Sequence, residues 1–150
     1  MEESYQANLL LAKAKSIDLN VNLSDNLPAV HIDAERINQV ITNLVTNAIK
    51  YSHKNTNITL EAFRSDGFVQ VSIKDQGQGI PEDELPNLFG KFTKTSTRST
   101  AGEKSTGLGL AIVKKIIEGH QCKIWVESKH GQGSVFSFTL PAAPITDTHQ

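Results

Sequence analysis

One segment in the first third of the chain carries an apolar stripe with helical spacing. Its apolar side chains recur at intervals of three and four residues, at Ile37, Val40, Ile41, Leu44, Val45 and Ala48. This spacing predicts an amphipathic helix over about residues 35–51. Asp33 precedes the helix as a candidate N-cap, and Glu35 lies near its positive end. A helix with a single apolar face has to pack against a second layer.

Short strands on both sides of this helix provide that layer. Residues 17–23 alternate strictly between apolar and polar and predict a half-buried strand. Residues 58–63 and 69–73 predict a hairpin, and residues 123–128 and 135–140 predict two more strands around a turn with two glycines. Five strands, several joined by short turns, predict a mostly antiparallel sheet.

Two further helices complete the predicted architecture. One extends from Leu108 to Glu118 and is ended by Gly119, and a short one begins at Pro81 and ends near Leu88. The predicted fold class is therefore α+β. It is a two-layer α/β sandwich with a mixed sheet of about five strands, covered on one face by about three helices.

Composition narrows the classes of partner. The 150 residues predict one domain, and the net charge of −1 gives no reason to expect nucleic acid or direct membrane contact. Cys122 is the single cysteine and is expected to be a small core residue in a reducing compartment. The five histidines have no metal-ligand spacing, and neither a Ser-His-Asp pattern nor a GxxxxGK[ST] motif is present.

Polar residues lie beside the apolar stripe of the long helix. Asn43, Asn47 and Lys50 fall together on one flank, and Arg36 joins them. Because asparagine is a poor helix former, the repeat at i and i+4 calls for a reason. One interpretation is a site edge, with an amide oxygen for a hydrated Mg²⁺ and a lysine for phosphate. The alternative is a solvated flank.

Two glycine-containing segments complete the candidate site. Asp75 ends a predicted strand before Gly77 and Gly79, which permit positive φ and close approach of a ligand, while the carboxylate can accept a hydrogen bond from an exocyclic amine. The alternative is an Asp-capped turn. The second segment, Gly107–Leu110, opens a helix whose first N–H groups can bind an anion, and Thr106 can cap that helix or contact phosphate. Its alternative is close helix–sheet packing.

A cationic loop lies before the second segment. It contains Lys91, Lys94, Arg98 and Lys104, with Glu103 as its single acid, and suits a triphosphate. The alternative is a solvated linker. Phe89 and Phe92 at its start are expected to be core anchors.

These blocks resemble the ATP-binding catalytic domain of sensor histidine kinases, within the gyrase, heat-shock-chaperone and mismatch-repair ATPase superfamily. Residues 39–51 resemble the N box, 75–80 the G1 box, 88–92 the F box, 102–110 the G2 box and 131–141 the closing hairpin. The resemblance covers about residues 17–141 and implies the two-layer Bergerat-type ATP-binding fold.

The resemblance also implies roles for individual residues. Asn47 would bind Mg²⁺, Asn43 would support the metal–phosphate site, and Lys50 would contact phosphate; these three are the implied catalytic residues. Asp75 would hydrogen-bond the adenine amine. The remaining implied ATP-binding residues are Tyr51, Gly77, Gly79, Ile80, Phe92, Lys94, Thr106, Gly107, Leu108, Gly109 and Leu110.

The implied function is the Mg-ATP-dependent catalytic half of a two-component sensor histidine kinase, a transferase. Its partners would be a histidine-bearing dimerisation domain and, through it, a response regulator, and its location would be cytoplasmic. Residues 1–15 are interpreted as the remnant of a preceding dimerisation helix, 16–141 as the catalytic domain and 142–150 as a disordered tail. The isolated domain is expected to be monomeric.

Two departures from a complete enzyme bear on the chemistry. Relatives that hydrolyse ATP have a glutamate four residues before the metal-binding asparagine, where this chain has Asn43, so very slow hydrolysis is expected. The chain also lacks the phosphoacceptor histidine motif. The alternatives left open are an anti-sigma-factor-like serine kinase and a non-catalytic nucleotide-sensing module, the latter because Ser105 stands where a glycine is frequent.

Overall fold

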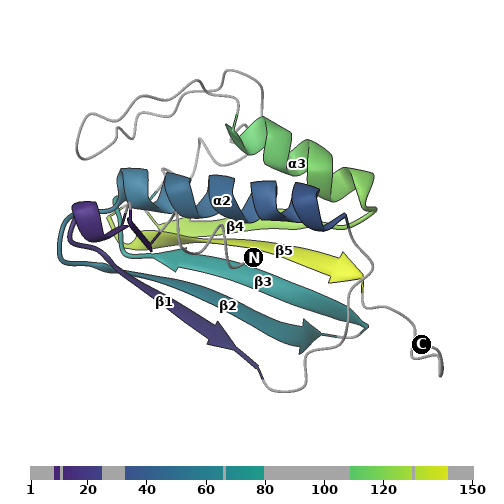
Figure 1. Ribbon diagram of the computed structural model, residues 1–150, viewed down its shortest axis with the longest axis horizontal. Helices are drawn as coiled ribbons and strands as arrows, with labels where there is room; N and C mark the ends of the chain where they lie inside the picture. The colour runs from purple at the N-terminus through teal and green to yellow at the C-terminus, as the bar shows by residue number, and fades with distance from the viewer. Residues whose placement is uncertain are drawn as a thin grey trace.

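The computed structural model describes residues 9–10, 12–24, 33–65, 67–79, 109–129 and 131–141. Within this part of the chain, five strands form one sheet, and the two long helices lie on one of its faces (Figure 1). The elements in chain order are β1 (Asp18–Leu23), α2 (Ala34–Tyr51), β2 (Asn57–Ser65), β3 (Phe68–Asp75), α3 (Gly109–Gly119), β4 (Ile124–Lys129) and β5 (Gly133–Pro141). This confirms the predicted α+β fold with a helical layer on a sheet. The helix predicted over residues 81–88 lies outside the described residues.

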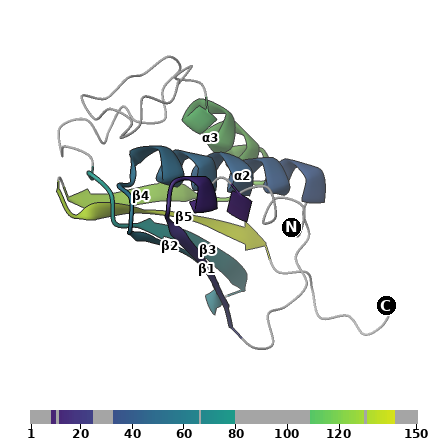
Figure 2. The same ribbon diagram turned by 60° about the vertical axis from the view of Figure 1, so that its left-hand side comes forward.

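The sheet is mixed, as predicted, and its strand order is β1-β2-β3-β5-β4. The β1–β2 pair is parallel, whereas β2–β3, β3–β5 and β4–β5 are antiparallel. A second view shows α2 crossing above the sheet with α3 beside it (Figure 2). Hairpins account for the β2–β3 and β4–β5 pairs, but the central β3–β5 pair joins two segments that are far apart in the sequence.

The hydrophobic core lies between the helices and the sheet. All six residues of the predicted α2 stripe are buried, and they face alternate residues of β2, β3 and β5. The largest fully buried side chains include Leu44 of α2, Ile58 of β2, Ile73 of β3 and Phe138 of β5. Cys122 is also buried, as predicted, and burial raises the pKa of its thiol.

The prediction of a half-buried first strand was wrong for most of its length. β1 forms where it was expected, but Val21 and Leu23 are 41% and 49% exposed. Their parallel register partners, Leu60 and Ala62, are buried. The difference arises because β1 is an edge strand with a neighbouring strand on one side. Its apolar side chains at Val21 and Leu23 alternate along the sequence but are not buried by other residues.

The ends of α2 are well defined. Asp33 caps the helix by accepting a hydrogen bond from Arg36 N at 3.3 Å, which confirms its predicted role. At the same end, Asp33 N donates to His120 Nε2 at 3.1 Å, while His120 Nδ1 lies 2.9 Å from Ile116 O of α3. The end of α3 is therefore tied to the start of α2, and the two helices lie antiparallel on the sheet (Figure 1). Neither helix is long and apolar enough to cross a membrane, judged over the described residues.

Candidate functional site

Asp75 is the last residue of β3, and backbone groups fix its carboxylate. Oδ1 accepts hydrogen bonds from Gly77 N at 2.9 Å and from Ser134 N of β5 at 3.1 Å. Among the described residues, both hydrogen bonds to this carboxylate go to Oδ1. One oxygen thus sets the orientation of the side chain, and Oδ2 is left to accept a donor from a ligand.

The surroundings of Asp75 change its protonation. Burial raises the pKa of this carboxyl to about 6, and the hydrogen bonds from Gly77 and Ser134 partly oppose that effect. The group is therefore mainly ionised at neutral pH, although its environment disfavours the charge. A carboxylate held in this way at a strand end is a strong hydrogen-bond acceptor.

The loop after Asp75 is attached to three other parts of the molecule. Asn57 N, at the start of β2, donates to Gln76 Oε1 at 2.8 Å. Gln78 N donates to Tyr51 O at the end of α2 at 3.3 Å, and Gln78 O accepts from Gly131 N in the β4–β5 turn. A loop fixed at these points presents its backbone to a ligand with little rearrangement.

The two predicted pocket glycines are required for different reasons. Gly79 has a φ of 73°, the positive value that was expected of a glycine here. Gly77 does not: a Cβ on this residue would lie 2.5 Å from Tyr51 O. Glycine at position 77 is thus explained by the close approach of the loop to α2.

The β4–β5 turn contacts Asp75, which was not predicted from the sequence. Gly133 has a φ of 97°, and a Cβ there would lie 2.2 Å from Asp75 O. Its neighbour Ser134 donates its N–H to Asp75, and its hydroxyl lies 2.8 Å from that of Ser128 on β4. The Gly-Gln-Gly sequence predicts the turn itself. The pairing of β3 with β5, which brings this turn to Asp75, could not be predicted from the sequence.

The predicted residues on α2 lie along its C-terminal half. Asn43, Asn47, Lys50 and Tyr51 are all half-buried, and the Lys50 ammonium lies 5.9 Å from the centroid of the Tyr51 ring. Because Tyr51 O contacts the Asp75 loop, the structure brings the end of α2 and this loop together. Amide oxygens at Asn43 and Asn47 are hard donors suited to a hydrated Mg²⁺ ion that keeps most of its other ligands as water and phosphate.

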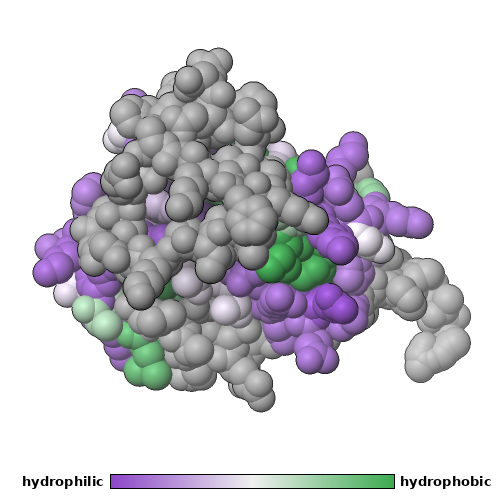
Figure 3. Space-filling view, turned by 90° about the horizontal axis from the view of Figure 1, so that it is seen from above, coloured by the Kyte–Doolittle hydropathy of each residue, from purple (hydrophilic) through white to green (hydrophobic). Residues whose placement is uncertain are grey.

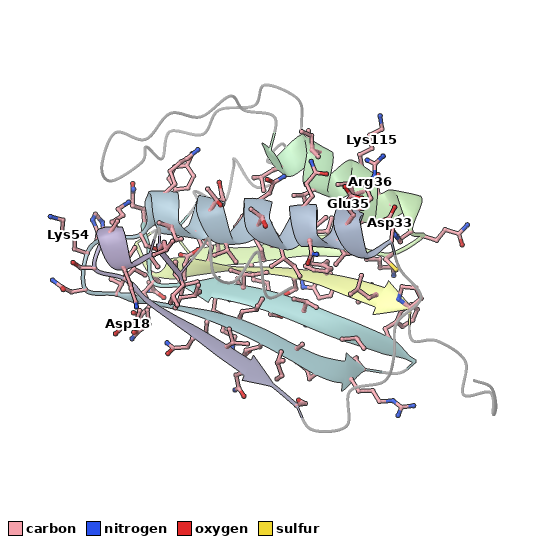
Figure 4. The ribbon with its side chains drawn as sticks, viewed as in Figure 1. Asp18, Asp33, Glu35, Arg36, Lys54 and Lys115 are labelled. Atoms are coloured by element: carbon pink, nitrogen blue, oxygen red, sulfur yellow. The ribbon has the colours of Figure 1, made fainter. Side chains whose placement is uncertain are left out.

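Arg36 does not join this group. It lies 14 residues before Lys50, which corresponds to about 21 Å along the helix axis. Figure 4 shows it with Asp33 and Glu35 at the N-terminal end of α2, while Asp18 and Lys54 mark the opposite end. Arg36 therefore shares a flank of α2 with the other predicted residues, but it lies too far along the helix to belong to the same site.

The second glycine segment is described only from Gly109, which begins α3. In both ribbon views the start of α3 lies above α2 (Figures 1 and 2). Leu110 is half-buried against the core. The predicted residues Ile80, Phe92, Lys94, Thr106, Gly107 and Leu108 lie outside the described residues.

Seen from the helix side, the described surface is mostly hydrophilic, with small hydrophobic patches (Figure 3).

The parts of the candidate site follow one another along α2. The loop that follows Asp75 contacts the C-terminal end of α2, Lys50 and Tyr51 lie in its last turn, and Asn47 and Asn43 lie about one and two turns earlier. This order matches a ligand with an amine-bearing head at one end and anionic groups at the other.

Comparison with known proteins shows the family to which this chain belongs. A model described as histidine kinase-, DNA gyrase B-, and HSP90-like ATPase matches residues 32–144. The adaptive-response sensory kinase SasA of Crocosphaera subtropica is 44% identical over 138 residues, which are 91% of this chain and 35% of that protein. This chain spans about a third of the length of the first curated relatives that it matches.

Solved structures of histidine kinases share the fold. The catalytic domain of histidine kinase ThkA superposes with a TM-score of 0.77 at 33% identity, covering 95% of this chain and 92% of that one. Full-length ShkA, solved in complex with AMPPNP, gives a TM-score of 0.81 at 28% identity, covering 95% of this chain and 29% of that one.

Proposed function

The chain belongs to the histidine kinase-, DNA gyrase B-, and HSP90-like ATPase family, and on this premise we propose that it is the Mg-ATP-binding catalytic domain of a two-component sensor histidine kinase. The observation that carries the proposal is the Asp75 carboxylate, whose Oδ1 is fixed by Gly77 N and Ser134 N. In this proposal Oδ2 accepts the exocyclic amine of adenine. A guanine base presents a carbonyl oxygen at the equivalent position, which a carboxylate repels.

The phosphates extend from Asp75 along α2 towards the start of α3. Lys50 contributes a positive charge, and the N–H groups that begin with Gly109 supply the positive end of a helix. Asn47 holds Mg²⁺ and Asn43 supports it through its amide. When bound, the ion neutralises phosphate charge and orients the terminal phosphoryl group. Ile80, Phe92, Lys94, Thr106, Gly107 and Leu108 complete the proposed ATP site.

The chemistry of position 43 favours transfer over hydrolysis. An amide at Asn43 cannot take a proton from water as a glutamate can, and a general base contributes about 10²–10⁴-fold to such a step. The γ-phosphoryl group is therefore presented to an incoming nucleophile by positioning and charge stabilisation. We propose that the nucleophile is a histidine on a separate dimerisation domain, from which the phosphoryl group passes to a response regulator.

The remaining assignments are proposed on the same basis. Residues 16–141 form the catalytic domain, 1–15 continue from the dimerisation helix, and 142–150 form a tail. The domain is a monomer in isolation and acts in the cytoplasm.

A transfer assay tests this function. The chain is incubated with γ-labelled ATP, Mg²⁺ and a histidine-bearing dimerisation domain from a sensor kinase. We expect acid-labile label on that domain, while Asn47→Ala abolishes Mg²⁺-dependent transfer and leaves the circular dichroism spectrum unchanged. Acid-stable label on serine, or ATP binding by calorimetry without transfer to any histidine domain, would contradict a histidine kinase.

A further inference from the structure

The C-terminal end of α2 is held from two sides. The last carbonyls of a helix have no partner within the helix and must find one elsewhere. Lys15 Nζ donates to Ile49 O at 2.8 Å and to Lys50 O at 3.1 Å. The next carbonyl, Tyr51 O, accepts from Gln78 N of the loop that follows Asp75. The residues before β1 and the proposed adenine-binding loop therefore bind successive carbonyls of a single helical turn.

Lys15 is unusual in its burial. It is 8% exposed, and it is the only charged side chain among the buried residues in the described part of the chain. Removing an ammonium group from water is costly unless strong acceptors replace the water. The negative end of the α2 dipole and two carbonyl oxygens supply such acceptors, so the position of the ammonium and the position of this turn determine each other.

The backbone around Lys15 is also fixed. Ile17 N donates to Ala12 O at 2.9 Å, and Ala12 is fully buried. Ser16 takes a φ of 59°, and its carbonyl accepts from Asn55 N, beyond the end of α2, at 2.8 Å. The segment before β1 thus contacts both the last turn of α2 and the residues that follow it.

We propose that Lys15 is a positioning residue for the nucleotide site. By holding the carbonyls of Ile49 and Lys50, it sets the last turn of α2, and with it Lys50, Tyr51 and the Asp75 loop. ATP affinity and the conformation of residues 12–17 are then coupled, and the coupling acts in both directions. This inference rests on the proposed ATP-binding function. It gives Lys15, which is not among the proposed ATP-binding residues, a role in shaping the ATP site.

The first test is the affinity of the full 150-residue chain for Mg-ATP, measured by titration calorimetry. Lys15→Met keeps the length of the side chain and removes its charge, and we expect it to weaken binding about five- to tenfold. Lys15→Arg keeps a cationic donor and is expected to restore most of the affinity. Lys13→Met is the matched control, because Lys13 is exposed two residues away, and its affinity should equal that of the wild type.

The second test separates positioning from stability and needs no variant. Hydrogen exchange of the Lys15 and Ile17 amides, which both donate to Ala12 O, is measured with and without Mg-ATP. We expect ATP to slow both amides several-fold, while the Thr139 amide, bonded to Lys123 O at the far edge of the sheet, keeps its rate.

The outcomes are distinct. Unchanged exchange at Lys15 and Ile17, or a folded Lys15→Met variant with wild-type affinity, overturns the role of Lys15 and leaves the proposed function standing. Failure of the wild type to bind ATP overturns both.

Discussion

At the scale of single residues, Asp75 carries a charge that the proposed function needs, in a buried environment that disfavours the ionised form. Burial raises its pKa from 3.8 to about 6. A carboxyl whose pKa is higher in the folded state contributes stability that is complete below pH ~4 and is lost as the pH rises through ~6. At pH 7 the ionised group therefore lowers the free energy of unfolding by at most about 3 kcal/mol. Such a cost is typical of residues retained for binding.

Asp75→Asn tests this balance. The amide oxygen can still accept from Gly77 N and Ser134 N, but the charge is gone. We expect the variant to be more stable than the wild type by up to about 3 kcal/mol at pH 7 and equal to it at pH 4. Urea unfolding at the two pH values measures the difference. Asp18→Asn, at an exposed position, should shift stability by less than about 0.5 kcal/mol. A loss of stability in the Asp75 variant at pH 7 would contradict the argument.

At the scale of elements, the β4–β5 turn supports the strand end that carries Asp75. Gly133→Ala would place a Cβ 2.2 Å from Asp75 O, so the turn must move. Movement displaces Ser134 N, which donates to Asp75 Oδ1. We expect Gly133→Ala to destabilise the chain by more than about 3 kcal/mol, or to retain the fold with ATP affinity reduced at least tenfold. Thermal unfolding and calorimetry together measure the effect.

Gly131 in the same turn is the matched control. It also has a positive φ, of 86°, but a Cβ at this position would meet nothing within 4 Å. Gly131→Ala should therefore cost only the backbone strain, about 1–2 kcal/mol, without a loss of ATP affinity in the folded protein. Equal effects of the two substitutions would show that contact with Asp75 is not the reason for glycine at position 133.

The contrast between these glycines marks what could be predicted from the sequence. Local periodicity located α2, α3 and all five strands, because apolar residues recur with the period of the element that contains them. At β1 the same alternation did not predict burial, because the strand lies at the edge of the sheet. The Asp75, Gly77 and Gly79 group was also recognisable from its residue types. Ser134 N on Asp75 and the ammonium of Lys15 on α2 were not, because each contact joins segments whose relative position is set by the whole fold.

At the scale of the whole molecule, sheet order is the feature that local patterns could not determine. β3 is the central strand, and it pairs with β5 although α3 and β4 lie between them in the sequence. Their pairing places Ser72 opposite Ser137, with the two hydroxyl oxygens 2.9 Å apart. These residues alternate with the core residues of their strands, so they lie on the sheet face opposite the helices, yet they are only 3% and 1% exposed.

This hydroxyl pair allows a test of the central strand pairing. Removing one hydroxyl leaves the other buried with fewer partners, at a cost of about 1–3 kcal/mol, whereas removing both leaves no hydroxyl to satisfy. We expect Ser72→Ala to lower the free energy of unfolding more than Ser137→Ala. When Ser137 is replaced, the Ser72 hydroxyl still has a hydrogen-bond partner, because its Oγ also accepts from Gln70 Nε2. The double variant should cost at least about 0.5 kcal/mol less than the sum of the singles.

Urea unfolding of the four proteins in the cycle gives this coupling energy. As a control, Ser72→Ala combined with Lys114→Gln, an exposed position on α3, should be additive within about 0.5 kcal/mol, because the two sites share no partner. Additive costs for the serine pair would mean that the two hydroxyls do not depend on each other in the folded protein. A coupling present in stability but absent from the folding rate would place the closure of β3 on β5 after the rate-limiting step, as expected for a pairing that joins distant segments.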